Sequence, residues 1–174
     1  QNNFFFRDQQ VLNLLNTVDS VEAIRIFMAY PKPWWTDYDL KCGRSTTDLN
    51  VRQFYYWYTA DPGDSNQDSF LLASYSNGDA EAYWLGLESG GNNFDDYNGS
   101  VPESGRFDAP QGKGPRHCTE VMAELAHQQI VQTVGANIKD VPQPYYAHFQ
   151  DWGKVTWGAG WHVWSSGAQF NNTL

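Results

Sequence analysis

Apolar residues recur at helical spacing in three segments of the chain. The strongest stripe lies within His117–Val134, where apolar positions follow one another at intervals of three and four residues. The positions on this stripe are Met122, Leu125, Ala126, Ile130 and Val134. Gly135 is well placed to end this helix, because glycine adopts the left-handed backbone found at many helix C-termini. Shorter stripes predict helices over residues 8–17 and Asp79–Leu87.

Four other segments are rich in β-branched and aromatic residues, and they predict strands. They are Val21–Tyr30, Gln53–Ala60, Ser69–Ser76 and Tyr145–Trp152. Pro31 and Pro33 end the first strand, because proline has no backbone N–H to donate to a sheet. Asp61-Pro62-Gly63-Asp64 has the composition of a tight turn, so we expect the second and third strands to pair antiparallel. The pattern predicts an α+β fold, with a mixed or antiparallel sheet flanked by helices.

Residues 89–115 show neither pattern. Gly, Asn, Asp, Ser and Pro dominate this stretch, and few apolar residues are present to anchor it to a core. We predict a long irregular surface segment, either a lid or a simple insertion. No repeat and no domain boundary is visible in the sequence, so residues 1–174 are predicted to form a single module.

The composition adds many aromatic residues and a strong negative charge. Phe, Trp and Tyr make up 16% of the 174 residues, which predicts either a dense core or a ring-lined pocket. The formal net charge is −9, and the sequence pI is near 4.7. Because such a surface repels phosphate groups and anionic lipid, we expect neither nucleic acid nor a membrane as a partner. No apolar run approaches the roughly 20 residues that a membrane span needs.

Several features bear on the compartment in which the protein works. The sequence begins at Gln1 rather than Met, which suggests a processed or cropped chain. N-glycosylation triplets begin at Asn98 and Asn171, so we expect a secretory route, with a soluble intracellular location as the alternative. Cys42 and Cys118 would form either one disulfide or two separate buried thiols.

No nucleotide-binding or metal-binding motif in the sequence is complete. In residues 111–115 a glycine follows the Gly-Lys pair where a P-loop needs Ser or Thr. Residues 158–160 lack the third glycine and the preceding strand of a dinucleotide fingerprint. Glu120, Glu124 and His127 share one helix face, but this Glu-x-x-His unit occurs once, so we interpret them as a solvated face. The other histidines have no mutual ligand spacing, and no metal is expected.

Four stretches together form a pattern that is hard to obtain by chance. They are Ile24–Met28 followed by Lys32–Trp35, then Gly43–Tyr56, then Leu71–Ala80, and finally Trp152 with Gly158–Trp164. The second is the most specific, because Gly-x-Ser-Thr-Thr-Asp-Leu is followed there by Arg-x-x-Tyr-Tyr. In order and spacing, residues 20–170 resemble the flavin-dependent amine oxidase family, and specifically its L-amino-acid oxidase branch.

The resemblance implies that this region is the substrate-binding domain only, a mixed sheet flanked by helices that covers the flavin ring. In the family, a Gly-x-Gly-x-x-Gly nucleotide-binding unit precedes the matching region and a second flavin-binding stretch follows it. Both are absent from this sequence. Flavin held by the substrate domain alone would lose its diphosphate site, so no flavin is expected on this chain by itself. FAD is expected only if partner chains supply the missing parts.

The resemblance also assigns roles to single residues. Tyr75 matches the tyrosine that hydrogen-bonds the substrate carboxylate, and Trp161 matches a position that lines the substrate side-chain pocket, with Tyr55 near it. Arg25 stands where many members carry a lysine that holds a water near the flavin ring. Because arginine stays charged, it cannot take that lysine's proton role, and no catalytic residue is expected in this chain. The alternative interpretation of Arg25 is a strand residue turned to solvent.

Two functions from different classes remain open on the sequence. The first is a non-catalytic, stand-alone binding protein that holds a small apolar or aromatic ligand, and an organic chromophore as that ligand would make it a chromoprotein. A homo-oligomer would cover the same apolar surface, the former flavin face, in place of a ligand. The second is one processed chain of an FAD-dependent L-amino-acid oxidase; a structural or storage protein is a third. The predicted ligand-binding residues are Tyr55, Trp57, Tyr75, Trp157, Trp161, His162 and Trp164.

Overall fold

The computed structural model describes residues 9–57, 68–88, 116–154 and 160–166 of the chain. The predicted irregular segment 89–115 lies outside these residues, and so does the predicted turn at 61–64. Trp157, Asn98 and Asn171 are outside them as well.

Six strands of the described residues form one sheet in the order β3-β4-β5-β2-β7-β6. All neighbouring strands in it run antiparallel. The bounds are β2 Ala23–Tyr30, β3 Gly43–Thr46, β4 Gln53–Tyr56, β5 Ser69–Asn77, β6 Arg116–His117 and β7 Tyr146–Asp151. This arrangement, with helices added to an antiparallel sheet, confirms the α+β class.

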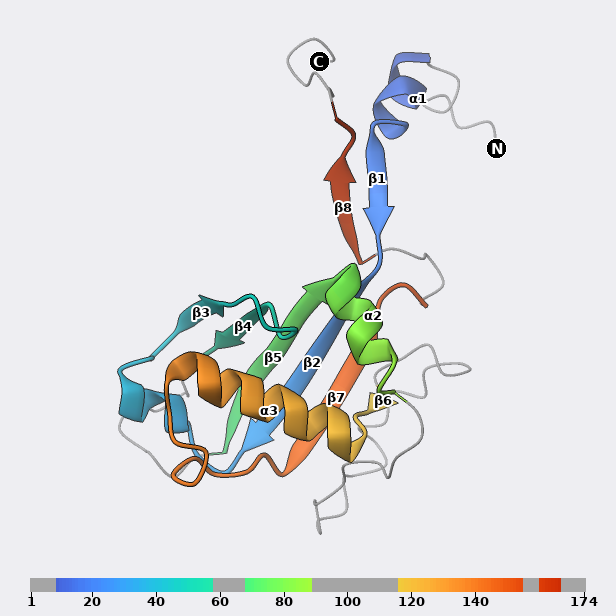
Figure 1. The fold of residues 1–174 in the computed structure, drawn as a ribbon. Helices are drawn as coiled ribbons and strands as arrows, with labels where there is room; N and C mark the ends of the chain where they lie inside the picture. The colour runs from blue at the N-terminus through green and yellow to red at the C-terminus, as the bar shows by residue number, and fades with distance from the viewer. Residues whose placement is uncertain (1–8, 58–67, 89–115, 155–159, 167–174) are drawn as a thin grey trace.

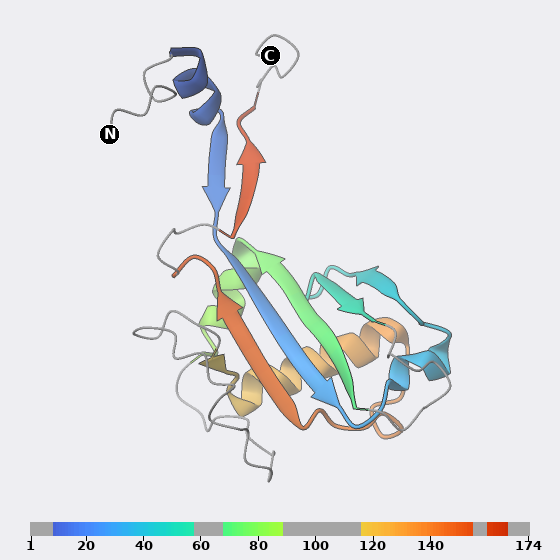
Figure 2. The same cartoon turned by 180° about the vertical axis from the view of Figure 1, so that it is seen from behind.

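Helices cover one face of this sheet and leave the other without a described helix. Helices α3 (Glu120–Val134) and α2 (Asp79–Leu85) lie in front of the strands in Figure 1, and the view from behind in Figure 2 shows the opposite face. Along β2, Ile24, Ile26 and Met28 point to the helices and are fully buried, whereas the residues between them are half-buried. The hydrophobic core therefore lies between the sheet and the two helices.

Helix α3 begins later than the sequence predicts. The Thr119 hydroxyl caps it by accepting a hydrogen bond from the Met122 backbone N–H at 3.2 Å, and Gly135 ends it with a left-handed φ of 76°. The predicted start at His117 is wrong, because Arg116 and His117 pair with β7 and form β6. Of the predicted stripe, Met122, Ala126 and Ile130 are buried.

A two-stranded ribbon extends from the sheet (Figure 1). It pairs β1 (Val18–Val21) with β8 (Trp161–Trp164), and α1 (Gln9–Leu15) precedes it. The predicted strand Val21–Tyr30 is confirmed from Ala23 onward as β2, but its first residue belongs to another strand, because Val21 pairs with Trp161 in the ribbon whereas Ala23 pairs with Asn77 in the sheet. The chain passes from one sheet to the other at Glu22.

The other predicted helices and strands occur within a few residues of their expected bounds, and the part of Gln53–Ala60 after Trp57 lies outside the described residues. A 3-10 helix, η2 (Trp34–Tyr38), and the strands β3 and β8 were not expected. None of the described helices has both the length and the apolar character needed to cross a membrane.

The two cysteines are separate thiols. Cys118 is buried and Cys42 is exposed, and neither is bonded to the other. The predicted alternative of a disulfide is therefore wrong, and so is burial of both thiols, because Cys42 precedes the edge strand β3. Burial raises the pKa of the Cys118 thiol, which keeps it protonated and unreactive.

Candidate functional site

The candidate site lies on the open face of the sheet, opposite the helices. Residues alternate between the two faces of a strand, so Arg25 and Phe27 of β2 point away from the buried Ile24, Ile26 and Met28. Both are half-buried. This face carries most of the residues that the sequence singles out.

A β-bulge brings two rings of β5 onto this open face. Phe70 and Tyr75 are five residues apart, and strict alternation would place them on opposite faces. The pairing with β2 shifts between Ile26 and Phe27, so Ala73 is an extra residue without a partner in the register. Phe70 consequently lies opposite Ala29 and Tyr75 opposite Arg25, which puts both rings on the same side.

Three rings from three strands form what we call the aromatic row: Tyr55, Tyr75 and Trp161. The ring centroids of Tyr55 and Tyr75 are 6.1 Å apart, and those of Tyr75 and Trp161 are 5.5 Å apart with nearly perpendicular planes. These are favourable aromatic geometries. Trp161 is 44% exposed, so much of its indole surface is available to a ligand. The structure thus brings together three of the predicted ligand-binding residues.

Trp161 is held over the sheet by a close backbone approach at the base of the ribbon. A Cβ atom on Gly160 would lie 2.6 Å from Trp152 Cβ and 2.7 Å from Ala23 Cβ, so only glycine fits this position without displacement. The backbone N–H of Trp152 donates to the Ala23 carbonyl at 2.8 Å and fixes the other side of the junction. Gly160 therefore allows the first residue of β8 to reach the ring of Tyr75.

Arg25 lies directly on the aromatic row. Its guanidinium carbon is 3.8 Å from the centroid of the Tyr75 ring and 5.8 Å from that of Trp152, both within cation–π range. The interpretation of Arg25 as a strand residue turned to solvent is wrong, because the side chain is half-buried among rings. Its Nη1 atom is shielded from solvent and has no hydrogen-bond partner among the described residues.

A second group of rings continues along the open face and includes Trp57. The ring of Trp57 stacks on Phe70 with centroids 5.6 Å apart, and Phe70 stacks on Phe27 at 5.4 Å. We call Trp57, Phe70 and Phe27 the stacked triplet. The sequence singled out Trp57 but neither phenylalanine, although the alternation along β2 was a signal for Phe27.

The remaining predicted residues lie along the ribbon or outside the described residues. His162 and Trp164 are on β8, where they pair with Ser20 and Val18 of β1. The His162 ring is 6.3 Å from the Trp161 ring and 5.8 Å from the Trp164 ring, so it continues the line of rings away from the sheet. Trp157 belongs to the residues that the structure does not describe.

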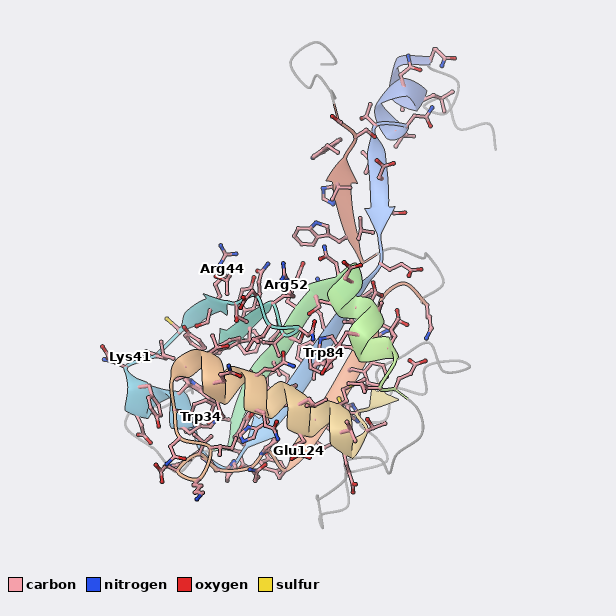
Figure 3. The ribbon with its side chains drawn as sticks, in the orientation of Figure 1. Trp34, Lys41, Arg44, Arg52, Trp84 and Glu124 are labelled. Carbon is pink, nitrogen blue, oxygen red and sulfur yellow. The ribbon has the colours of Figure 1, made fainter. Side chains whose placement is uncertain are left out.

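The covered face holds a buried histidine where the sequence predicted solvent. His127 of α3 is 1% exposed, and its Nδ1 atom is hydrogen-bonded to the Tyr30 hydroxyl at 3.0 Å. The interpretation of Glu120, Glu124 and His127 as one solvated face is therefore wrong for the histidine and right for the two glutamates, of which Figure 3 labels Glu124. Burial lowers the pKa of His127 to about 4, so the ring is neutral at pH 7.

A group of charged residues surrounds the junction of α2, β7 and the ribbon. Glu81 is 4% exposed, and burial, together with the charges of Asp151 and Glu22, raises its pKa to about 7. Lys154 Nζ lies 3.2 Å from Asp151 Oδ2 and 3.0 Å from Glu88 Oε1. The hydrogen bond to Glu88 is the main cause of a raised pKa at Lys154, although burial opposes it. No group of three or more potential metal ligands occurs among the described residues.

Two known proteins resemble this chain in sequence over most of its length. No protein-family model matches the chain. The chain is 23% identical to Aplysianin-A of Aplysia kurodai over 157 residues, which cover 90% of this chain and 26% of that relative. It is 25% identical to Achacin of Lissachatina fulica over 165 residues, 92% of this chain and 28% of that relative.

Both matches support a distant relationship to the L-amino-acid oxidase family. The chain spans 26% and 28% of the lengths of these two relatives, so what the whole relatives do does not transfer directly to it. Tyr75 and Trp161, for which the sequence predicts ligand contacts, are in ring contact on the open face.

Proposed function

We propose that this chain is a substrate-domain-like module whose open face binds a small apolar or aromatic ligand, and that it performs no redox chemistry by itself. The observation that carries the proposal is the aromatic row on a sheet face that no described helix covers. An organic chromophore is one ligand of this class, and it would make the protein a chromoprotein.

The physical basis is the apolar surface that the open face leaves accessible. Trp161 is 44% exposed, Trp57 45% and Phe70 47%, although all three make ring contacts. A planar ligand that removes about 200 Å² of apolar surface from water would gain roughly 5 kcal/mol, before the costs of association. Rings that are already held by neighbouring rings lose little further freedom when the ligand binds, which favours affinity.

The second candidate function is the substrate side of an FAD-dependent L-amino-acid oxidase whose flavin-binding parts are supplied by other polypeptide segments. The lengths of the relatives favour this candidate, because this chain matches 26% and 28% of them. In that assembly the open face would lie against the flavin, and the aromatic row would hold the amino acid. The two candidates use the same surface and differ in what covers it.

An absorption spectrum of the purified chain separates the two candidates. For the binding module we expect either an organic chromophore band or absorption by the aromatic residues alone, and no peroxide production with a panel of L-amino acids. Flavin bands together with peroxide production by the isolated chain would overturn the proposal. If peroxide appears only after a flavin-binding polypeptide is added, the second candidate is correct.

Binding to the aromatic row is tested with indole as a neutral probe and with two matched tryptophan variants. Trp161 and Trp164 lie on the same short strand and are 44% and 48% exposed; Trp161 has a described ring contact with Tyr75, whereas the described ring contact of Trp164 is with His162. By calorimetric titration, we expect Trp161→Ala to weaken indole binding about tenfold, as the loss of one good aromatic contact implies. Trp164→Ala should change it less than about twofold. Equal effects of the two variants would contradict a site at the aromatic row.

Two further properties belong to the same proposal. Self-association would cover the open face in the absence of a ligand, and sedimentation at several concentrations tests for a dimer that indole dissociates. A secretory route is proposed from the triplets at Asn98 and Asn171. It is tested by the mass of the native protein before and after removal of N-linked sugars.

A further inference from the structure

Arg25 is a half-buried cation without an anionic partner among the described residues. Its described contacts are the rings of Tyr75 and Trp152. Lys154 shows the usual arrangement, because it is within 4 Å of the carboxylates of Glu88 and Asp151. In a chain with a net charge of −9, an arginine that is held away from every described carboxylate is unusual.

At least one hydrogen-bond donor of the guanidinium, Nη1, has no acceptor among the described residues. The guanidinium carbon lies over the Tyr75 ring, 3.8 Å from the ring centroid, and this cation–π contact uses no N–H donor for a hydrogen bond. The N–H donors of arginine point outward in the guanidinium plane, toward the edge. Of these nitrogens, Nη1 is shielded from solvent and has no acceptor among the described residues. A buried donor on a charged group that lacks an acceptor is costly, and such groups normally have a partner.

The surroundings of Arg25 on the open face are neutral. Tyr75 is its cross-strand neighbour on β5 and Gln150 its neighbour on β7. The Gln150 amide donates to the Asp151 carbonyl at 2.9 Å, so that donor is already used within β7. Beyond Tyr75 are the rings of Tyr55 and Trp161. Because Arg25 is half-buried among these rings, its attraction to an anion is stronger than it would be for a fully solvated guanidinium.

We propose that Arg25 is an anion-binding residue that determines specificity, and that the ligand of the open face is an aromatic carboxylate. The planar edge of the guanidinium would receive the two carboxylate oxygens, and the ligand ring would lie against Trp161. Trp152, whose ring centroid is 5.8 Å from the guanidinium carbon, is 38% exposed, and Trp161, which contacts Tyr75, is 44% exposed, so a ligand on the open face can contact both rings. This inference rests on the proposed function and names the chemical class of its ligand.

The test compares indole-3-acetate with neutral indole by calorimetric titration. We expect the wild-type chain to bind indole-3-acetate about tenfold or more tightly than indole, and the preference to shrink as salt is added. Arg25→Gln should remove the preference, so that the ratio of the two affinities falls to about one. Arg25→Lys, which keeps the charge but loses the planar pair of donors, should retain only part of the preference.

The outcomes separate this inference from the proposed function. If indole binds but indole-3-acetate binds no better, and Arg25→Gln changes neither, then the anion-binding role is wrong and the aromatic site stands. If neither compound binds the wild-type chain, then the proposed aromatic site is wrong, and the proposed role of Arg25 is wrong as well. Thermal unfolding of each variant verifies that it is folded, and Arg25→Lys provides the answer if Arg25→Gln does not fold.

Discussion

The two faces of the central sheet are built from the same strands but have opposite chemistry. On the covered face, β2 contributes Ile24, Ile26 and Met28, which pack against helices and are fully buried. On the open face, the same strand contributes Arg25 and Phe27, which lie among rings that are partly accessible to solvent. The difference shows that one strand can supply a buried core from its even-numbered residues and a partly accessible aromatic surface from its odd-numbered residues.

The bulge in β5 shows how this division can be adjusted locally. Without the extra residue Ala73, the alternation would send either Phe70 or Tyr75 into the covered face. With the bulge, Leu71 and Ser74 face the helices, whereas Phe70 and Tyr75 join the open face. A single inserted position therefore lets a core strand present two rings on the open face.

The largest expected effect of breaking the covered face comes from its largest side chains. Trp84 of α2, labelled in Figure 3, is fully buried in the hydrophobic core, and its indole N–H donates to the Asn50 carbonyl at 2.9 Å. We expect Trp84→Ala to lower the free energy of unfolding by about 3–5 kcal/mol, because it leaves a large cavity. Trp84→Phe, which keeps most of the ring, should cost less. Urea unfolding measures both, and a small loss for the alanine variant would contradict this description of the core.

Acid should weaken the covered face through His127. Burial lowers the pKa of this histidine to about 4, against 6.5 for the unfolded chain. Between pH 4 and pH 6.5 the unfolded state binds a proton that the folded state does not bind. The stability that depends on a neutral His127 is therefore complete above pH 6.5 and is lost as the pH falls toward 4. The loss amounts to about 3 kcal/mol at most. Urea unfolding of wild type and His127→Gln across this range should give curves that diverge as the pH falls; parallel curves would show that His127 does not titrate in this way.

Much of the fold could be predicted from local patterns, because the long elements repeat their signals several times. The stripe of α3 and the aromatic strands β2, β5 and β7 were found within a few residues. The ribbon could not be found, because its two short strands come from distant parts of the sequence and their pairing leaves no local periodicity. The burial of His127 was missed because its helix face was judged from the glutamates beside it.

For the candidate site, the resemblance to a family supplied the residues and the structure supplied their arrangement. Tyr55, Tyr75 and Trp161 could be named from motifs, but their ring contacts depend on the bulge at Ala73 and on the close approach at Gly160. Neither feature has a specific sequence signal. For the same reason, the stacked triplet and the contact of Arg25 with Tyr75 were not foreseen.

An effect of opposite sign to that of His127 is expected at Glu81. Its pKa is raised to about 7, first by burial and then by Asp151 and Glu22, against 4.5 for the unfolded chain, while Lys154 opposes the rise. The folded state therefore holds the proton more tightly, and this stabilisation is present below pH 4.5 and lost as the pH rises through 7.

Replacing the carboxyl of Glu81 with a neutral amide should remove this pH dependence. At pH 8 we expect Glu81→Gln to have a free energy of unfolding about 1–3 kcal/mol higher than that of wild type. Near pH 5 the two free energies should be similar. Glu124→Gln on the exposed side of α3 is the matched control and should have little effect at either pH. A Glu81→Gln difference that is the same at both pH values would point to altered packing and not to titration.

The smallest expected effect is at Trp57, the open-face counterpart of Trp84. Its ring is 45% exposed, and its described ring contact is the stack on Phe70. We expect Trp57→Ala to lower the free energy of unfolding by less than about 1 kcal/mol, because much of the side chain is already in water and one stacked pair is lost. The measurement is the same urea unfolding that is used for Trp84→Ala. If Trp57→Ala instead costs as much as Trp84→Ala, and the cost grows with protein concentration, the open face is covered by a second copy of the chain and its rings belong to an interface.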